Sequence, residues 1–217
     1  MAYRAMIFDL DGTLLNTLDD LATAANAALQ RFGFPTHATE AYRRFVGDGS
    51  PVLIQRALPQ ERQDPAIRER CLKAFLEIYA RSWDVRTRPY DGIPAMLDAL
   101  SAENVKMAIL SNKPHAMALE AVAKLLPHWH FEPLLGHREN VLRKPDPAGA
   151  LEIARHLKLS PSDFIFLGDS GVDIKTARAA GMLAAGALWG FRSKEELQKA
   201  GADTLIARPR QILAFFK

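Results

Sequence analysis

The stretch Ala5-Met6-Ile7-Phe8-Asp9-Leu10-Asp11-Gly12-Thr13 decides the fold of this chain. An apolar run that ends in acidic residues and a glycine is typical of a buried parallel strand that opens into a loop. Ligands bind at the carboxyl ends of the strands in open α/β sheets, so carboxylates placed there favour chemistry over packing. Residues two apart near a strand end project to the same side, and we therefore expect Asp9 and Asp11 to lie close together.

Two carboxylates that close repel each other unless a cation lies between them or one keeps a proton. Both solutions indicate phosphoryl transfer, because carboxylate and carbonyl oxygens suit Mg²⁺ and an aspartate can attack phosphorus to form an aspartyl-phosphate. Asp9 is the expected nucleophile. Asp11 is the expected acid that protonates the leaving oxygen and later activates water. In isolation, an Asp-x-Asp-Gly sequence is more often a strand end capped by Asx-type hydrogen bonds.

The composition of the 217 residues, 48% hydrophobic and 24% charged, is ordinary for a soluble globular protein. The net charge is +3 and no basic run occurs, so we expect no nucleic-acid partner. A single cysteine, Cys71, excludes an intrachain disulfide. No apolar run approaches the length of a membrane span, and charge returns too early for a signal peptide. We therefore expect a cytoplasmic protein with no membrane partner.

Residues 16–88 differ in pattern from the rest of the chain. Helical periodicity covers residues 17–82 without a convincing strand, and Ser50-Pro51 and Asp64-Pro65 each place a capping side chain before a proline at a helix start. Arg88-Pro89-Tyr90-Asp91-Gly92 supplies turn residues for a return linker. The pattern predicts a helical insertion between the first strand and the rest of a sheet.

From Pro94 onward, helical and strand patterns alternate, as a parallel sheet demands. The pattern predicts helices over residues 94–102, 114–126, 147–157, 172–180 and 193–201 with a last helix after 209, and strands over 105–110, 134–135, 164–167, 183–188 and 204–207. The expected fold class is therefore α/β, a parallel-sheet core with a smaller helical insertion.

Polar residues follow these strands at the edge where Asp9 is expected. Ser111 and Asn112 come directly after residues 105–110, and their side chains can hydrogen-bond phosphate oxygens with help from amides at the next helix start. A parallel sheet gathers its strand ends at one edge, so both residues should lie near Asp9. Taken alone, Ser111 is equally plausible as a helix N-cap.

Lys144, Asp169 and Asp173 belong to the two later loops. Lys144 would offset the repulsion between Asp9 and an incoming phosphate, and Asp169 would complete the metal ligands. Asp173, near a helix start, could reach the metal through water or only cap the helix. Singly, Lys144 could be a solvated lysine and Gly168-Asp169 a turn. In order at successive strand ends, these loops together indicate an active site.

The chain resembles the haloacid dehalogenase superfamily. Its four signature motifs are matched by Asp9-Leu10-Asp11-Gly12-Thr13, Ser111-Asn112, Lys144 and Gly168-Asp169-Ser170-Gly171-Val172-Asp173, and the helical insertion resembles the superfamily's cap of the first type. The match covers essentially the whole chain. Thr17-Leu18-Asp19-Asp20-Leu21 and the stretch over residues 45–58 further resemble phosphoglycolate phosphatases. Asn16 departs from the pattern, because many relatives carry aspartate there, but it lies past the catalytic pair.

The resemblance implies a Rossmann-like catalytic core over residues 1–15 and 89–217 and a helical cap over residues 16–88. It implies Mg²⁺ bound by the side chains of Asp9 and Asp169 and by the backbone carbonyl of Asp11, with Thr13 in support. The implied reaction is hydrolysis of a small phosphomonoester, above all 2-phosphoglycolate, through an aspartyl-phosphate.

Other functions remain open at this point. A sugar-phosphate phosphatase, a pyrophosphatase or a phosphomutase could use the same site. A phosphoacceptor signalling module is a different class, which needs neither Asp11 as an acid nor a long helical lid. A dehalogenase is disfavoured because its chemistry has no leaving alkoxide for Asp11 to protonate. The expected partner is a small phosphorylated metabolite, and the chain could be a monomer or a homodimer.

Substrate identity must come from the insertion, because the core motifs recognise only phosphate and metal. Within it, Val46-Gly47-Asp48-Gly49-Ser50 is the expected substrate loop. Gly47 and Gly49 flank Asp48 and permit positive φ and close backbone approach, and Pro51 starts a helix whose first amides could meet a small carboxylate. The alternative is an ordinary turn between helices.

Overall fold

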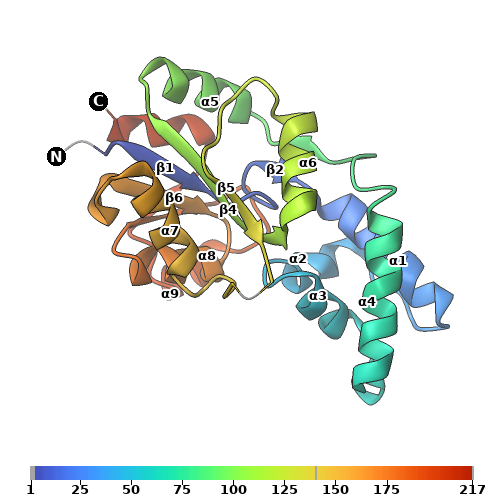
Figure 1. Cartoon of the computed structure of the whole chain (residues 1–217). Coiled ribbons are helices and arrows are strands. Elements are labelled where there is room, and N and C mark those ends of the chain that lie inside the picture. Colours follow the sequence, from blue (N-terminus) through green and yellow to red (C-terminus); the bar gives the residue numbers. More distant parts are fainter. Residues whose placement is uncertain (1–2, 140, 217) are drawn as a thin grey trace. The chain divides into compact units, whose positions relative to one another are not determined.

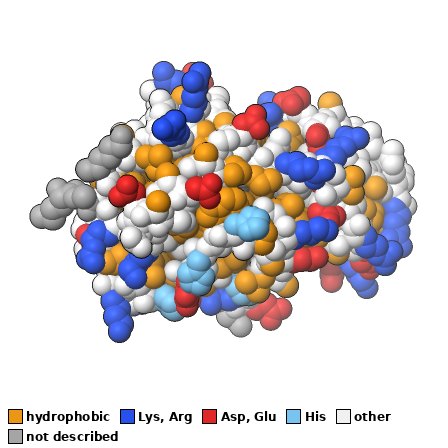
Figure 2. Space-filling view, turned by 90° about the horizontal axis from the view of Figure 1, so that it is seen from above, with side chains coloured by type: hydrophobic (Ala, Val, Ile, Leu, Met, Phe, Trp, Pro, Cys, Tyr) orange, Lys and Arg blue, Asp and Glu red, His pale blue; other side chains and the backbone are white. Residues whose placement is uncertain are grey.

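A computed structural model describes residues 3–139 and 141–216 (Figure 1). The chain forms two compact units, one of Met1–Leu15 with Pro89–Lys217 and one of Asn16–Arg88. Within the part of the chain that is described, no helix is both long and apolar enough to cross a membrane. On the face drawn in Figure 2, basic and acidic side chains are interspersed, as on a solvated surface.

The first unit is built on a six-stranded sheet in the order β5-β4-β1-β6-β7-β8, and every neighbouring pair is parallel. The strands are β1 (Ala5–Phe8), β4 (Lys106–Pro114), β5 (Leu134–His137), β6 (Phe164–Gly168), β7 (Leu183–Ala187) and β8 (Thr204–Ile206). The predicted α/β fold class is confirmed. β1 lies between β4 and β6, so the loop that follows it is flanked by the loops after both neighbours.

Helices connect the strands and bury both faces of the sheet. They are α5 (Ile93–Ala102), α6 (His115–Leu125), α7 (Ala148–Leu157), α8 (Gly171–Ala179) and α9 (Lys194–Lys199). Alternate residues of a strand face opposite sides, and Ala5 and Ile7 accordingly join a core cluster with residues of α7, α8 and α9. On the opposite face, the Phe8 ring meets Phe131 edge to face, with ring centroids 6.3 Å apart.

Two elements differ from the sequence-based prediction. β4 was expected to end at residue 110, but it continues to Pro114, with an irregular register against β5 between Leu110 and Pro114. Ser111, Asn112 and Lys113 therefore lie on the strand itself. Ser111 is not an N-cap, because Pro114 occupies that position of α6. The last helix is a 3₁₀ helix, Pro209–Phe215, with a proline at its start.

The second unit contains α1 (Leu18–Arg31), α2 (Tyr42–Phe45), α3 (Ser50–Ala57) and α4 (Pro65–Tyr79). The Asp64 side chain accepts from the Ile67 amide and Pro65 opens α4, as the sequence predicts. Asp20 of α1 is buried and accepts hydrogen bonds from Thr87, which ties α1 to the return segment. The two short strands β2 (Leu15–Asn16) and β3 (Arg88–Pro89) form a separate sheet.

Candidate active site

Three aspartates gather at the carboxyl ends of β1 and β6. Asp9, Asp169 and Asp173 each offer a carboxylate oxygen, and these oxygens lie within 4.8 Å of one another. All three residues are buried, with 7%, 2% and 1% of their surface exposed. Carboxylates this close and this dry require positive charge nearby, because burial and mutual repulsion both disfavour their ionised forms.

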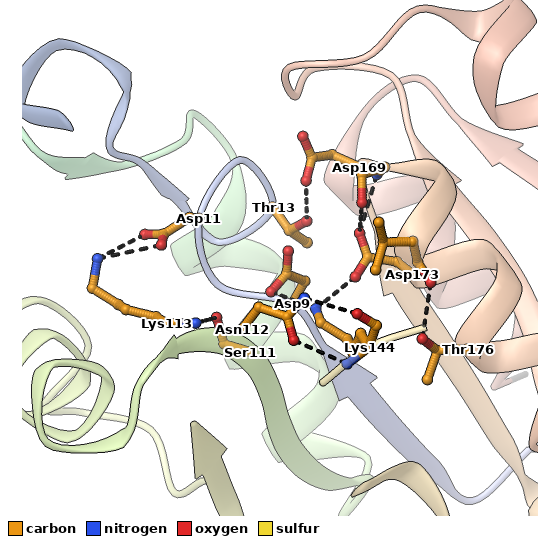
Figure 3. A network of polar contacts seen from close by, with 12 residues as sticks. Asp9, Asp11, Thr13, Ser111, Asn112, Lys113, Lys144, Asp169, Asp173 and Thr176 are labelled. Atoms are coloured by element: carbon orange, nitrogen blue, oxygen red, sulfur yellow. Dashed lines mark hydrogen bonds and ion pairs between the residues drawn. The ribbon is translucent and has the colours of Figure 1, made fainter. Parts of the chain in front are cut away.

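Lys144 supplies part of that charge (Figure 3). Its Nζ lies 2.8 Å from Asp9 Oδ1 and 2.6 Å from Asp173 Oδ1, and 5.7 Å from the centre of the Phe166 ring. Burial by itself would lower the pKa of Lys144, but Asp173 and Asp9 hold it above its ordinary value, so the side chain stays charged. Lys144 is 5% exposed, so it is not the solvated lysine that the sequence alone permits.

One lysine does not balance three carboxylates. Burial, with Asp173 and Asp11 nearby, raises the pKa of Asp9 to about 7 despite the opposing effect of Lys144. Burial, with Asp173 and Asp9 nearby, likewise raises the pKa of Asp169 to about 8. These buried carboxylates carry more negative charge than Lys144 neutralises. Such a group fits a hard divalent cation, since these ions prefer carboxylate oxygens. The donor set could hold a metal ion through Asp9 and Asp169.

Asp169 is fixed by two segments far apart in the chain. The Thr13 hydroxyl donates to Oδ1 at 3.2 Å and the Phe191 amide donates to Oδ2 at 2.7 Å. The Trp189 indole donates to the Thr13 carbonyl at 2.9 Å, so the two segments also bond each other. Both oxygens of Asp169 are thus oriented by hydrogen bonds, which leaves little freedom to its carboxylate.

The loop after β7 is the part of the site that the sequence-based reasoning missed. A Cβ on Gly190 would lie 2.5 Å from the Gly12 carbonyl oxygen and would clash with the Asp169 side chain. Gly190 therefore lets this loop approach Asp169 closely enough for the Phe191 amide to bond it. The available signal was Trp189-Gly190-Phe191 at another strand end, but these residue types carry no chemistry by themselves.

Asp173 caps the start of α8. Its Oδ2 accepts from the Ser170 amide at 3.1 Å, as part of a capping box, and also accepts from the Ser170 hydroxyl at 2.6 Å. Its Oδ1 accepts from Lys144 Nζ. The helix-capping alternative for Asp173 therefore holds, and the same side chain also belongs to the acidic group.

Asn112 organises the loop of Lys144. Its Oδ1 accepts from the Lys144 amide at 3.0 Å, and its Nδ2 donates to the Lys144 carbonyl at 3.1 Å. The Ser111 hydroxyl, also buried, accepts from the Lys113 amide at 3.2 Å. The structure thus brings Ser111, Asn112 and Lys144 together on neighbouring backbone at the edge where Asp9 lies (Figure 3).

The Asp11 carboxylate does not join the group formed by Asp9, Asp169 and Asp173, among the residues that the structure describes. Its two oxygens lie 3.1 and 3.3 Å from Lys113 Nζ, and Figure 3 shows this pair apart from the cluster around Lys144. Asp11 is still among the charges that raise the pKa of Asp9, so the two aspartates lie near each other although their carboxylates have different partners. Gly12, at φ +88°, turns the backbone directly after Asp11 and ends the extended segment that leads from β1.

The second unit contains the expected substrate loop. Gly47 and Gly49 have φ of 118° and 91°, positive values of the kind that glycine permits. Asp48 pairs with Arg56 of α3 at 2.7 Å, and Arg56 also donates to the Phe45 carbonyl at 3.2 Å. This loop is therefore braced from α3, although its charged side chains remain partly exposed.

Comparison with known proteins agrees with this geometry. The family model described as haloacid dehalogenase-like hydrolase matches residues 6–187. The chain belongs to this family. The match runs from β1 to the end of β7 and includes the helical unit, so the predicted family resemblance is confirmed and the chain is an enzyme, a hydrolase.

Members of this family with known names are similar to the chain over nearly its full length. A phosphoglycolate phosphatase of Xylella fastidiosa is 34% identical, with 95% of this chain and 90% of that protein covered. A phosphoglycolate phosphatase of Pseudomonas putida is 32% identical over 97% of this chain and 78% of that protein. A crystal structure from Lactobacillus delbrueckii subsp. bulgaricus, assigned as a phosphoglycolate phosphatase, is 31% identical with a TM-score of 0.92 and covers 100% and 99% of the two chains. The predicted likeness to phosphoglycolate phosphatases is confirmed.

Proposed function

We propose that this chain hydrolyses 2-phosphoglycolate with Mg²⁺ through an aspartyl-phosphate on Asp9. The observation that carries the proposal is the buried group of Asp9, Asp169 and Asp173 with a single lysine among them. That group is costly to bury without a cation, and it follows the strand whose end the family uses for its chemistry. The choice of 2-phosphoglycolate as substrate rests on the relatives, which are named phosphoglycolate phosphatase.

In the first step, a carboxylate oxygen of Asp9 attacks phosphorus, and the bond between phosphorus and the ester oxygen breaks. Asp11 gives its proton to that leaving oxygen, so glycolate departs as the alcohol. In the second step, Asp11 takes a proton from water as the water oxygen attacks phosphorus. The bond between phosphorus and Asp9 breaks, which releases phosphate and restores both aspartates.

The remaining residues hold the phosphoryl group and its charge. Lys144 and the Ser111 hydroxyl would contact phosphate oxygens, and Asn112 would help by keeping the Lys144 backbone in place, a function its two hydrogen bonds support. Mg²⁺ would be held by Asp9, Asp169 and the Asp11 carbonyl. When bound, the cation offsets negative charge on the carboxylates and the phosphoryl group.

We propose that the helical unit, residues 16–88, is the cap that selects the leaving group. The loop over Gly47, Asp48 and Gly49 would recognise glycolate, since its glycines permit close approach of a small carboxylate to backbone amides. The cytoplasm as compartment and a monomer or homodimer as assembly remain predictions from the sequence.

A screen of phosphate release with and without Mg²⁺ tests the proposal. The panel contains 2-phosphoglycolate, a hexose phosphate, pyrophosphate and 4-nitrophenyl phosphate, and kcat/KM is measured for each. We expect the highest value for 2-phosphoglycolate and no turnover after chelation of the metal. A higher value for the hexose phosphate or pyrophosphate would reassign the substrate. Conversion of one sugar phosphate to its isomer without phosphate release would identify a mutase. Stable phosphorylation of Asp9 without turnover would identify a phosphoacceptor module.

A further inference from the structure

The site contains two lysine–aspartate groups that differ in arrangement. Lys144 lies between Asp9 and Asp173, inside the acidic group. Lys113 contacts both carboxylate oxygens of Asp11. Figure 3 shows that the Lys113 side chain reaches Asp11 from β4, on the opposite side from Lys144. The two aspartates of the first motif, two residues apart in sequence, are thus held by different lysines.

The backbone around Asp11 is already fixed by its own loop. The Gly12 amide donates to the Leu15 carbonyl at 2.8 Å, and the amides of Leu14 and Leu15 donate to the Leu10 carbonyl at 3.0 and 2.9 Å. These bonds place the Cα of Asp11 but leave its side-chain torsions undetermined. In the described part of the chain, Lys113 is the partner of the Asp11 carboxylate, so this lysine decides where the carboxylate points.

Lys113 is itself well placed to hold another group. Its side chain is only 4% exposed, and its amide donates to the Ser111 hydroxyl. β4 pairs with β1 over Lys106–Ile109, and Lys113 lies a few residues beyond, where the register of β4 against β5 is irregular. A buried ammonium holds its carboxylate partner more closely than a pair of surface side chains would.

Without Lys113, the carboxylate of Asp11 would have a competing destination. The group of Asp9, Asp169 and Asp173 is where a cation would bind, and a carboxylate only two residues from Asp9 would be drawn toward the same positive charge. A carboxylate oxygen that coordinates a divalent cation is turned toward the metal and away from the leaving oxygen, so it cannot deliver a proton there. Two carboxylates with different tasks need different surroundings.

We propose that Lys113 is a positioning residue that keeps the Asp11 carboxylate out of the metal-binding group and directed to the leaving oxygen. The inference rests on the proposed function, in which Asp11 protonates that oxygen. Lys113 forms and breaks no covalent bond in this role. Its contribution is confined to the step in which the proton of Asp11 passes to the ester oxygen.

The test compares substrates that need this proton to different degrees. 4-Nitrophenyl, phenyl and benzyl phosphate all carry a flat ring, lack a carboxylate, and have leaving groups of increasing basicity. The variants are Lys113→Met, which removes the charge and keeps most of the side-chain length, Lys113→Arg, which keeps the charge, and Asp11→Asn. Lys106→Met, an exposed lysine at the other end of the same strand, is the matched control.

We expect Lys113→Met to lose about tenfold more kcat/KM on benzyl phosphate than on 4-nitrophenyl phosphate, because general acid catalysis matters most for the poorest leaving group. Lys113→Arg should recover part of that difference, and Lys106→Met should show none. The double variant Lys113→Met with Asp11→Asn should be no worse than Asp11→Asn alone, since both changes remove one function. Melting temperatures accompany each variant, and Lys113→Gln, which also removes the charge, replaces Lys113→Met in the comparison if Lys113→Met does not fold.

The outcomes separate this inference from the proposed function. If Asp11→Asn itself affects all three ring substrates equally, the proposed acid role fails, and the positioning role of Lys113 fails with it. If the loss of kcat/KM with Asp11→Asn depends on the leaving group but Lys113→Met lowers kcat/KM equally on all three substrates, Lys113 acts on phosphate charge or on stability. Only this inference is then overturned. The variants are also assayed on 2-phosphoglycolate, and a loss with Lys113→Met confined to this substrate would identify Lys113 as a ligand of its carboxylate and would overturn the inference.

Discussion

The acidic group of the first unit and the glycine loop of the second differ in how they are held. Asp9, Asp169 and Asp173 are buried at strand ends, where Lys144 and the Phe191 amide restrict them. Gly47, Asp48 and Gly49 lie on a turn between helices, and the Asp48–Arg56 pair that braces it is 27% and 38% exposed at its two side chains. Buried charge pairs respond strongly to the loss of one partner, whereas exposed pairs contribute little.

The contrast suggests a division of labour. A sheet edge can keep several charges in fixed relative positions, because hydrogen-bonded strands on both sides set the origin of every loop. A turn between helices can change with less effect on the rest of the unit. Chemistry that is common to all phosphomonoesters therefore suits the first region, and substrate selection suits the second. The following experiments test this division, beginning with the largest expected effect.

Asp9→Asn should lower kcat by several orders of magnitude on every substrate, because it removes the attacking charge and one carboxylate of the acidic group. The fold should stay intact, since asparagine preserves the shape and removes a buried negative charge. Kinetics on 2-phosphoglycolate and 4-nitrophenyl phosphate, with circular dichroism, measure both effects. Substantial turnover by this variant would exclude the covalent mechanism.

Gly190→Ala should lower kcat/KM by about 10- to 100-fold on all substrates alike, because its methyl group would displace Asp169 from the geometry that Thr13 and Phe191 impose. A raised Mg²⁺ requirement should accompany the loss. Gly171→Ala is the matched control, since a Cβ there lies at an ordinary 3.4 Å from Ala200. Equal effects of the two alanines would remove the close-approach argument for Gly190.

Gly47→Val should lower kcat/KM about tenfold more with 2-phosphoglycolate than with 4-nitrophenyl phosphate. The change alters recognition of the leaving group and leaves the residues that carry out phosphoryl transfer untouched. A β-branched residue is strained at φ 118°, so Gly33→Val, at φ 71° with no atom within 4 Å of its Cβ position, controls for strain in the same unit. The Mg²⁺ dependence should not change. Equal losses on both substrates would return Gly47 to the role of a turn residue.

The smallest expected effect is on the stability of the metal-free protein. The folded-state pKa values of Asp9 and Asp169, about 7 and about 8, lie above the unfolded value of 3.8, so the folded state binds more protons between these limits. Stability from these groups is therefore present at low pH and is lost as the pH rises toward 8. Lys144, Asp173, Asp11 and Arg192 are the charged groups that modulate this titration.

Melting temperatures measured with a chelator at about pH 5 and about pH 8 test this expectation. Asp169→Asn should gain stability relative to the wild type as the pH rises, because it cannot acquire the buried charge. Added Mg²⁺ should stabilise the wild type more at the higher pH, where no proton has to be displaced. A constant difference between the two proteins across this range would show that the acidic group carries no unusual proton affinity.

The sequence by itself determined the fold class and the residues that come together at the sheet edge. Short apolar runs that end in polar residues predict parallel strands, and sheet topology places the ends of such strands together, so Asp9, Ser111, Lys144 and Asp169 were found without coordinates. The positive φ of Gly47 and Gly49 was also predictable, because glycine is the residue that adopts it at least cost.

Only the tertiary structure decided which of these side chains pair. Three of these contacts join segments more than twenty residues apart. They are Lys113 with Asp11, Asn112 with the Lys144 backbone, and the Phe191 amide with Asp169. Sequence patterns report local periodicity and the edge at which a strand ends, but not the torsions of a side chain or which of two nearby lysines a carboxylate meets. Those choices follow from the extension of β4 to Pro114 and from the close approach that Gly190 permits, and both depend on packing across the whole sheet.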